Sequence, residues 1–136
     1  MKTLFMIVIV ILALALQSAV PSFGQTTTSE KPFVVGADNN ESSKASLDLL
    51  AERAGRDKLI VFVARLGTLE PAQSLRRRRL HTALEYLQST RDFPAERLVS
   101  AFGDPISKEG RIEVYLDNKL FMIFLFKRNE NFASEP

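Results

Sequence analysis

The chain contains no cysteine, and His81 is its only histidine. The lack of cysteine excludes disulfide bonds, thiol nucleophiles, thiolate metal sites and a lipid-modified N-terminal cysteine. A single histidine leaves little room for a Ser-His-Asp triad, and G-x-S-x-G, phosphate-binding glycine loops and paired-carboxylate spacings are all missing. His81 is spaced to pair with Glu85 one helical turn later, as surface residues commonly do. We therefore expect a protein without catalytic residues, metal or cofactor.

An excess of charge of one sign is also missing. The formal net charge is only +2, and Lys2 is the sole charged residue among residues 1–24. Nucleic-acid-binding domains present a much larger basic excess. The composition therefore predicts no nucleic-acid partner, and any electrostatic function must come from local clusters of charge.

The N-terminus has the features of a secretory signal. Lys2 precedes an unbroken apolar run from Leu4 to Leu16, which is shorter than the roughly 20 residues that span a bilayer. Ser22 and Gly24 fit a signal-peptidase site with cleavage before Gln25, and cleavage after Ala19 is the alternative. We therefore expect an exported protein, periplasmic or associated with the outer membrane.

The remaining 112 residues are enough for one domain. Residues 25–32 are polar and include Pro32, which is typical of a spacer. Residues 128–136 are polar apart from Phe132 and are interpreted as a tail. The predicted organisation is a signal peptide (1–24), a spacer (25–32), a folded domain (33–127) and a polar tail (128–136).

Hydrophobic periodicity predicts an α+β fold. Apolar residues at 3–4 spacing indicate helices at 43–54 and 75–89, the second capped by Ser74, whereas short apolar or alternating segments indicate strands. Asp117-Asn118 fits a two-residue hairpin turn. Helices between single strands require crossover connections and hence some parallel pairing. We expect a mixed sheet with two helices on one face, in the order β-α-β-α-β-β plus a C-terminal hairpin strand, with strands at 33–35, 59–64, 98–102, 111–116 and 120–126.

The run Leu120–Phe126 has two interpretations. It is either a strand inside the core or an exposed surface for a partner or a membrane. Lys119, Lys127 and Arg128 flank it as charged residues flank aggregation-prone strands.

Four consecutive arginines, Arg76–Arg79, open the second predicted helix. Their 100° spacing sweeps most of the helix circumference, so they do not form one flat patch. Arg76 and Arg79 fall on the apolar side, and we expect their head groups at the rim of the sheet, whereas Arg77 and Arg78 point to solvent. Basic charge at a helix N-terminus opposes the macrodipole. The run is either an anion-binding site or a solvated face that pairs with nearby acids.

From Leu75 onward the chain resembles the OmpA-like, peptidoglycan-associated domain family. That family's second helix follows L-S-x-x-R-A-x-x-V-x-x-Y-L, a loop G-[IV]-P-A-x-R-[IL] comes next, and a late strand reads R-[VI]-E-[IV]. The corresponding residues here are Leu75, Arg76, Arg79, Leu80, Ala83, Tyr86 and Leu87, then Phe93–Leu98, then Arg111–Val114. The resemblance covers roughly Phe33 to Leu116, and the strand from Lys119 to Phe126 lies outside the usual family core.

The resemblance implies binding of the diaminopimelate of peptidoglycan through an Asp and an Arg. The Arg falls on Arg79, but the Asp of the family's G-H-T-D loop has no counterpart in Ala64–Leu69, and Glu70 is the nearest acid. Ala72-Gln73 replaces the family's Asn before the helix. Candidate ligand-binding residues are Arg79, Arg76 and Glu70.

Two hypotheses follow from these patterns. The first is a non-enzymatic cell-envelope domain that binds an anionic envelope component, with peptidoglycan as the candidate. The alternative is a protein–protein interaction module of the envelope that has lost peptidoglycan binding and pairs with another envelope protein through its last strand.

Overall fold

The structure is a computed structural model that describes residues 30–133. The expected signal sequence and residues 25–29 of the spacer lie outside the described residues. Within the described range the helices and strands follow the predicted order. Their bounds are β1 Phe33–Gly36, α2 Asn40–Ala54, β2 Ile60–Arg65, α3 Gln73–Ser89, the 3-10 helix η1 Ala95–Arg97, β3 Leu98–Phe102, β4 Arg111–Leu116 and β5 Lys119–Leu125.

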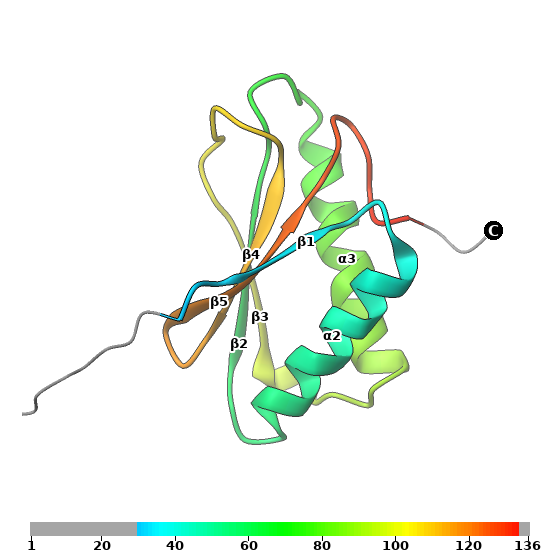
Figure 1. Ribbon diagram of the computed structural model, residues 1–136, viewed down its shortest axis with the longest axis vertical. Coiled ribbons are helices and arrows are strands. Elements are labelled where there is room, and N and C mark those ends of the chain that lie inside the picture. The colour runs from blue at the N-terminus through cyan, green and yellow to red at the C-terminus, as the bar shows by residue number, and fades with distance from the viewer. Residues whose placement is uncertain (1–29, 134–136) are drawn as a thin grey trace, which may run out of the picture. The chain divides into compact units, whose positions relative to one another are not determined.

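The strands form one mixed sheet in the order β1-β5-β4-β2-β3. β1 runs parallel to β5 and β3 runs parallel to β2, whereas β4 is antiparallel to both β5 and β2. Figure 1 shows α2 and α3 together on one side of the sheet. The predicted α+β class, with a mixed sheet and two helices on one face, is confirmed.

The last hairpin forms as the sequence predicts. Asp117 and Asn118 adopt φ values of 51° and 61°, the left-handed conformation that a two-residue turn needs. The turn returns the chain as β5, which lies between β1 and β4 inside the sheet. Met122 and Phe124 of β5 are fully buried. The run Leu120–Phe126 is therefore an interior strand of the sheet.

The two helices begin differently. Asn39 caps α2, because its Oδ1 accepts a hydrogen bond of 3.0 Å from the Ser42 N–H. α3 begins at Gln73 after Ala72, which makes no side-chain capping bond. The predicted cap at Ser74 is wrong, because the Leu75 N–H bonds to Ala72 O and Ser74 already lies in the first turn. Of the described helices, none combines the length and apolarity that a membrane crossing requires.

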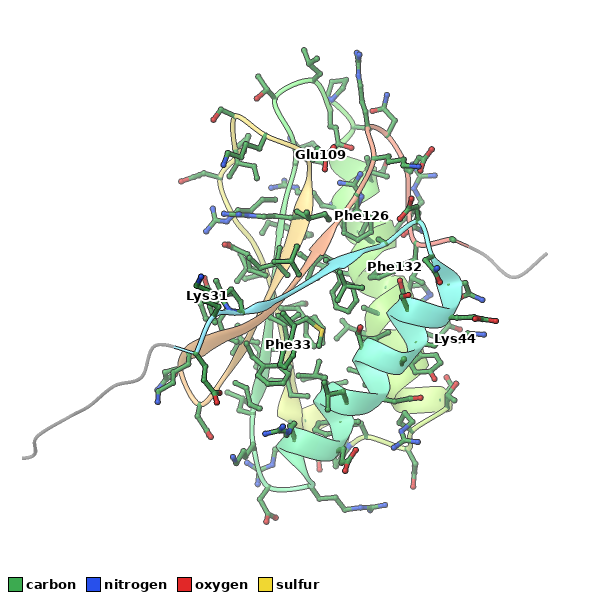
Figure 2. The ribbon with its side chains drawn as sticks, in the orientation of Figure 1. Lys31, Phe33, Lys44, Glu109, Phe126 and Phe132 are labelled. Atoms are coloured by element: carbon green, nitrogen blue, oxygen red, sulfur yellow. The ribbon has the colours of Figure 1, made fainter. Side chains whose placement is uncertain are left out.

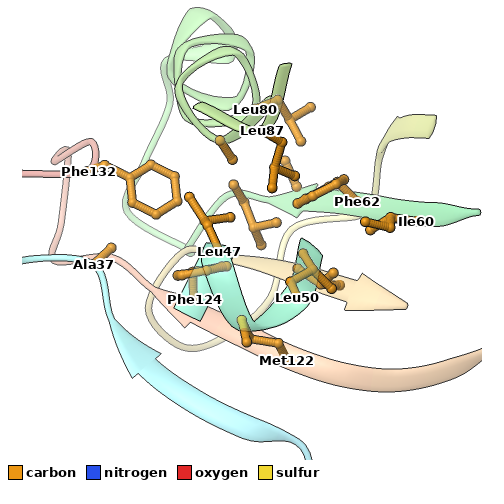
Figure 3. Close-up of a cluster of buried hydrophobic side chains, with 14 of the residues drawn as sticks. Ala37, Leu47, Leu50, Ile60, Phe62, Leu80, Leu87, Met122, Phe124 and Phe132 are labelled. Atoms are coloured by element: carbon orange, nitrogen blue, oxygen red, sulfur yellow. The ribbon is translucent and has the colours of Figure 1, made fainter. Parts of the chain in front are cut away.

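The core fills the space between the helices and the sheet, as Figure 3 shows. One stripe of each helix faces inward, and the strands contribute every second residue. Leu84, at the margin of the α3 stripe, is only partly buried. The main core side chains are Leu47, Leu50, Phe62, Leu80, Leu87, Met122 and Phe124.

The segment after β5 packs on the domain, so the prediction of a free polar tail is wrong for residues up to Ala133. Residues 128–136 are predicted to be a polar tail, but residues up to Ala133 pack on the domain. The Phe132 ring meets Phe124 and Phe126 edge to face, at 5.2 and 4.9 Å between ring centroids. The Ala133 N–H also donates to Ala37 O at 3.0 Å. Figure 2 shows Phe126 and Phe132 on the same side of the sheet as the helices. A single aromatic residue thus anchors an otherwise polar segment.

Candidate functional site: a buried ion pair beside a loop-lined pocket

Three chain segments meet at one end of the sheet. They are the loop between β2 and α3, the loop between β3 and β4, and the segment that leaves β5 (Figure 1). Because β2, β3 and β5 run in the same direction, their carboxyl ends all lie at this end. The topology therefore brings Glu70, Gly110 and residues 126–130 close to the N-terminal half of α3.

Glu70 and Arg79 form a bidentate ion pair at this place. Arg79 Nη1 donates to Glu70 Oε1 at 3.0 Å, and Nη2 donates to Oε2 at 2.5 Å. The Arg79 side chain is 1% exposed and the Glu70 side chain is 2% exposed. The planar guanidinium matches the two carboxylate oxygens, which is the strongest geometry for such a pair.

Backbone groups satisfy most of the remaining hydrogen-bonding capacity of the pair. Arg79 Nε donates to Glu130 O at 2.8 Å, and Nη2 also reaches Lys127 O at 3.5 Å. The Gly67 and Asn129 N–H groups donate to the Glu70 carboxylate at 2.9 and 2.7 Å. The pair is thus held from several sides by chain segments that are distant in sequence.

The Phe126 ring and the backbone of Gly110 complete the surroundings of the guanidinium. It stacks over the Phe126 ring at 4.3 Å from the centroid, which is a cation–π contact. Gly110 lies so close that a Cβ atom there would collide with Glu70 Oε1 and Arg79 Nη1. Any side chain at position 110 would therefore displace the ion pair.

Electrostatics keep the carboxyl group of Glu70 ionised. Burial raises the pKa of Glu70, but hydrogen bonds from Arg79, Gly67 and Asn129 lower it by more. The pKa consequently lies below its ordinary value. At neutral pH the site contains a carboxylate against a guanidinium, with no net charge.

A pocket of about 230 Å³ opens beside Glu70. Arg79 is not among its lining residues, because it lies deeper in the domain. The pocket wall carries charges of both signs. The lining residues are Gly67, Thr68, Leu69, Glu70, Ser107, Lys108, Glu109, Gly110 and Arg128.

The structure separates the sequence-predicted site residues. Glu70 and Arg79 come together, but the expected position of the Arg79 head group at the rim is wrong, because the segment 127–130 covers it. Arg76 lies elsewhere, with its guanidinium 4.5 Å from the centroid of the Phe102 ring and Nη1 donating to Gly103 O at 3.3 Å. Arg77 and Arg78 are exposed, as predicted.

A second charged cluster, for which the sequence patterns give no direct signal, lies on β2 and β4. The Glu113 carboxylate is bonded by Arg65 Nε and, at 3.2 Å, by Arg111 Nη2. These residues alternate with the core residues Ala64 and Ile112, so they lie on the face of the sheet that points away from the helices. The hydrogen bond with Glu113 raises the pKa of Arg65. The apolar–polar alternation of Arg111–Leu116 predicts a solvent-facing side chain at position 113, but the Glu113 side chain is only 6% exposed.

No family model, curated relative or solved structure matches this chain.

Among residues 30–133, no group of three or more His, Cys, Asp or Glu side chains is placed to hold a metal ion. His81 and Glu85 form the expected exposed pair at 3.3 Å.

Proposed function

We propose that this protein is a non-enzymatic, exported module of the cell envelope that acts by binding another envelope protein. Its sequence resembles the OmpA-like domain, but in this proposal the arginine that the resemblance assigns to the ligand has a structural role. The observation that carries this proposal is the bidentate pair of Arg79 with Glu70, which leaves the guanidinium 1% exposed.

Binding of a ligand carboxylate by Arg79 would require the displacement of Glu70. The displaced carboxylate would remain buried without its partner, and breaking a buried ion pair in this way costs about 3–5 kcal/mol. The segment 127–130 would also have to move, because Glu130 O and Lys127 O accept hydrogen bonds from the same guanidinium. The arrangement therefore favours a structural role for Arg79.

Glu70, the acid nearest to the position of the family's missing Asp, is also engaged inside the domain. A zwitterionic ligand such as diaminopimelate needs an anion for its ammonium group and a cation for its carboxylate. Glu70 and Arg79 supply one of each, but they neutralise one another inside the domain. Neither the Glu70 carboxylate nor the Arg79 guanidinium is therefore free to bind the ammonium or carboxylate group of such a ligand.

Protein binding is supported by the opposite side of the molecule. Both helices cover one face of the sheet (Figure 1), and the other face carries partly exposed apolar residues together with the Arg65–Glu113–Arg111 cluster. Val34 and Val99, at the two edges of this face, are 61% and 40% exposed. Val99 belongs to β3, whose outer side pairs with no strand among residues 30–133, and such an edge can pair with a strand of another protein.

Photo-crosslinking in the native host tests the proposal. A photoreactive amino acid replaces Val99 in the full chain, which is exported with its own signal sequence. We expect an adduct of defined mass that survives muramidase digestion and disappears on protease treatment. An adduct that muramidase removes would assign the protein to peptidoglycan and contradict the proposal.

Binding of an anionic envelope component is the second candidate, and the pocket beside Glu70 favours it. Lys108 and Arg128 line that pocket and are exposed, so they could hold a carboxylate without disturbing the ion pair. Sedimentation with isolated peptidoglycan distinguishes the candidates. Pelleting that is lost in Lys108→Gln and Arg128→Gln, but kept in Arg78→Gln, would put this candidate first.

A further inference from the structure

β3 is an unprotected edge of the sheet. All of its residues after Leu98 are exposed, although its sequence Leu98–Phe102 is mainly apolar. Within residues 30–133 no strand pairs with its outer side, because β3 ends the strand order. Natural edge strands are usually guarded by an inward charge, a proline or a bulge, and β3 contains none of these. The other edge, β1, is shorter.

The outward backbone groups of β3 can be assigned from its pairing with β2. Gly103 N–H donates to Ala64 O at 2.9 Å, so Gly103 faces β2. Alternate residues of a strand bond to the same neighbour in a parallel ladder. The N–H and C=O groups of Ser100 and Phe102 and the C=O group of Leu98 therefore point outward, where they can pair with an added strand, whereas the Leu98 N–H already bonds to Ala95 O.

Basic side chains flank this edge at the start of α3. Arg76 covers the Phe102 ring and bonds to Gly103 O, while its buried Nε has no hydrogen-bond partner among the described residues. Arg77, next along the helix, is exposed. Tyr86 and Thr82 mark the opposite flank of α3, since Tyr86 bonds to Asp48 of α2 and Thr82 to Asn131. Arg76 and Arg77 thus lie toward the free edge.

We propose that β3 is the docking site for an extended, acidic segment of a partner protein, which adds to the sheet as a further strand. The inference rests on the proposed function, because it names the surface and the chemistry of the partner. Main-chain hydrogen bonds to Ser100, to Phe102 and to the Leu98 C=O provide the pairing. A carboxylate of the partner segment complements the charge of Arg76 and Arg77. The basic residues at the N-terminus of α3, which oppose the helix dipole, acquire a function in this arrangement.

A second copy of this chain fits the edge less well. Antiparallel pairing of two β3 strands would bring the α3 arginines of both copies to one side of the joined sheet. Those arginines would gain no acidic partner from the second copy. Charge complementarity therefore favours a different, acidic chain.

The test uses a fluorescein-labelled peptide of alternating valine and glutamate, with a valine–lysine peptide as its control. Fluorescence anisotropy measures binding to the full exported chain. We expect the acidic peptide to bind and the basic peptide to bind at least about tenfold more weakly, which corresponds to one or two charge contacts. Binding of the acidic peptide weakens as salt is added. Absence of binding, or equal binding of both peptides, would overturn the proposal.

Ser100→Pro is the decisive variant. It removes an outward N–H and leaves the β2 ladder intact, and proline is tolerated on the free side of an edge strand. We expect about a tenfold or greater loss of peptide binding, since a hydrogen bond disappears and the ring obstructs the edge. Ser100→Thr, which keeps the N–H, retains binding. Unchanged binding by a folded Ser100→Pro variant contradicts the proposal.

Variants of the α3 arginines test the charge complementarity with the partner and leave the sequence of β3 unchanged. Arg77→Gln should weaken binding of the acidic peptide several-fold, whereas Arg78→Gln, on another face of α3, should leave it unchanged. Equal effects of the two would overturn the role of the α3 arginines. A dimer that dissociates in Ser100→Pro would assign the edge to a second copy instead. If the muramidase-resistant adduct persists in Ser100→Pro, the β3 site is wrong while the partner-binding function stands.

Discussion

Arg79 and Glu70 are nine residues apart in the chain, and their side chains form two parallel hydrogen bonds of 3.0 and 2.5 Å. Both groups are buried, and backbone groups of Gly67, Asn129 and Glu130 bind their remaining atoms. The pair therefore links the β2–α3 loop, α3 and the segment after β5. This relationship determines both the stability of the loop end and the availability of Arg79 to a ligand.

Removal of one member of the pair should be strongly destabilising. Glu70→Leu leaves the Arg79 guanidinium buried without its carboxylate, and we expect the free energy of unfolding to fall by about 3–5 kcal/mol. Urea denaturation measures the change. In the double variant Glu70→Leu/Arg79→Met most of this loss should be recovered, because apolar replacement of a whole buried pair is often neutral. Additive losses in the double variant would show that the two residues are not coupled.

The pair should also give the protein a specific acid sensitivity. The folded state holds the pKa of Glu70 below its ordinary value, so the stabilisation is fully present above that value, about 4.3 in an unfolded chain. It is lost as the pH falls through the lower pKa of the folded state, because the unfolded chain takes up the proton first. The stability difference between wild type and Glu70→Gln should therefore narrow as the pH falls below about 4. A difference that widens in acid contradicts the assignment.

Gly110→Ala should disturb the same site from the opposite side. A methyl group at position 110 would collide with both Glu70 Oε1 and Arg79 Nη1, so the buried ion pair would have to shift. We expect a loss of about 1–3 kcal/mol, as overpacking commonly produces. Gly36→Ala is the matched control, because the Cβ there meets only the side chain of the exposed Asp38. Equal losses in both variants would argue against a rigid site at Gly110.

The helices, strands and final hairpin could be predicted from the sequence because their signals are local. The alternation in Arg111–Leu116, the apolar stripe of α3 and the turn residues Asp117-Asn118 each need only neighbouring positions. The site could be predicted only in part. The sequence indicates Glu70 as the nearest acid, but the pairing of Glu70 with Arg79 depends on a loop conformation that has no periodic signal.

The predictions that are wrong concern contacts between segments that are distant along the chain. Arg79 lies inside the domain and not at the rim, because residues after Lys127 pack over it and do not extend as a tail. In the structure Glu130 O, which lies 51 residues away from Arg79 along the chain, accepts a hydrogen bond from it. Asn129, at φ 61°, turns the chain back toward the domain and lets Phe132 reach the core. A single phenylalanine in a polar segment was the available signal, and it was too weak to predict docking.

The docking of the C-terminal segment leads to a further prediction. Phe132→Ala should lower the free energy of unfolding by about 3–5 kcal/mol, the usual loss for a buried aromatic side chain. Phe33→Ala serves as the control, because Phe33 is 49% exposed at the sheet edge and should matter much less. Thermal or urea denaturation measures both. A negligible effect at Phe132 would restore the interpretation of residues 128–133 as a tail.

The most direct test of the account observes Arg79 itself. Heteronuclear NMR resolves the Nε–H of a buried arginine that donates to a carbonyl, as Arg79 does to Glu130 O at 2.8 Å. The protein is titrated with a soluble muropeptide that contains diaminopimelate, and exposed Arg78 serves as the internal control. We predict that the Arg79 signal neither shifts nor broadens, because its guanidinium remains on Glu70. A saturable shift of that signal, together with its loss in Arg79→Lys, would show that Arg79 binds the ligand and would contradict the account.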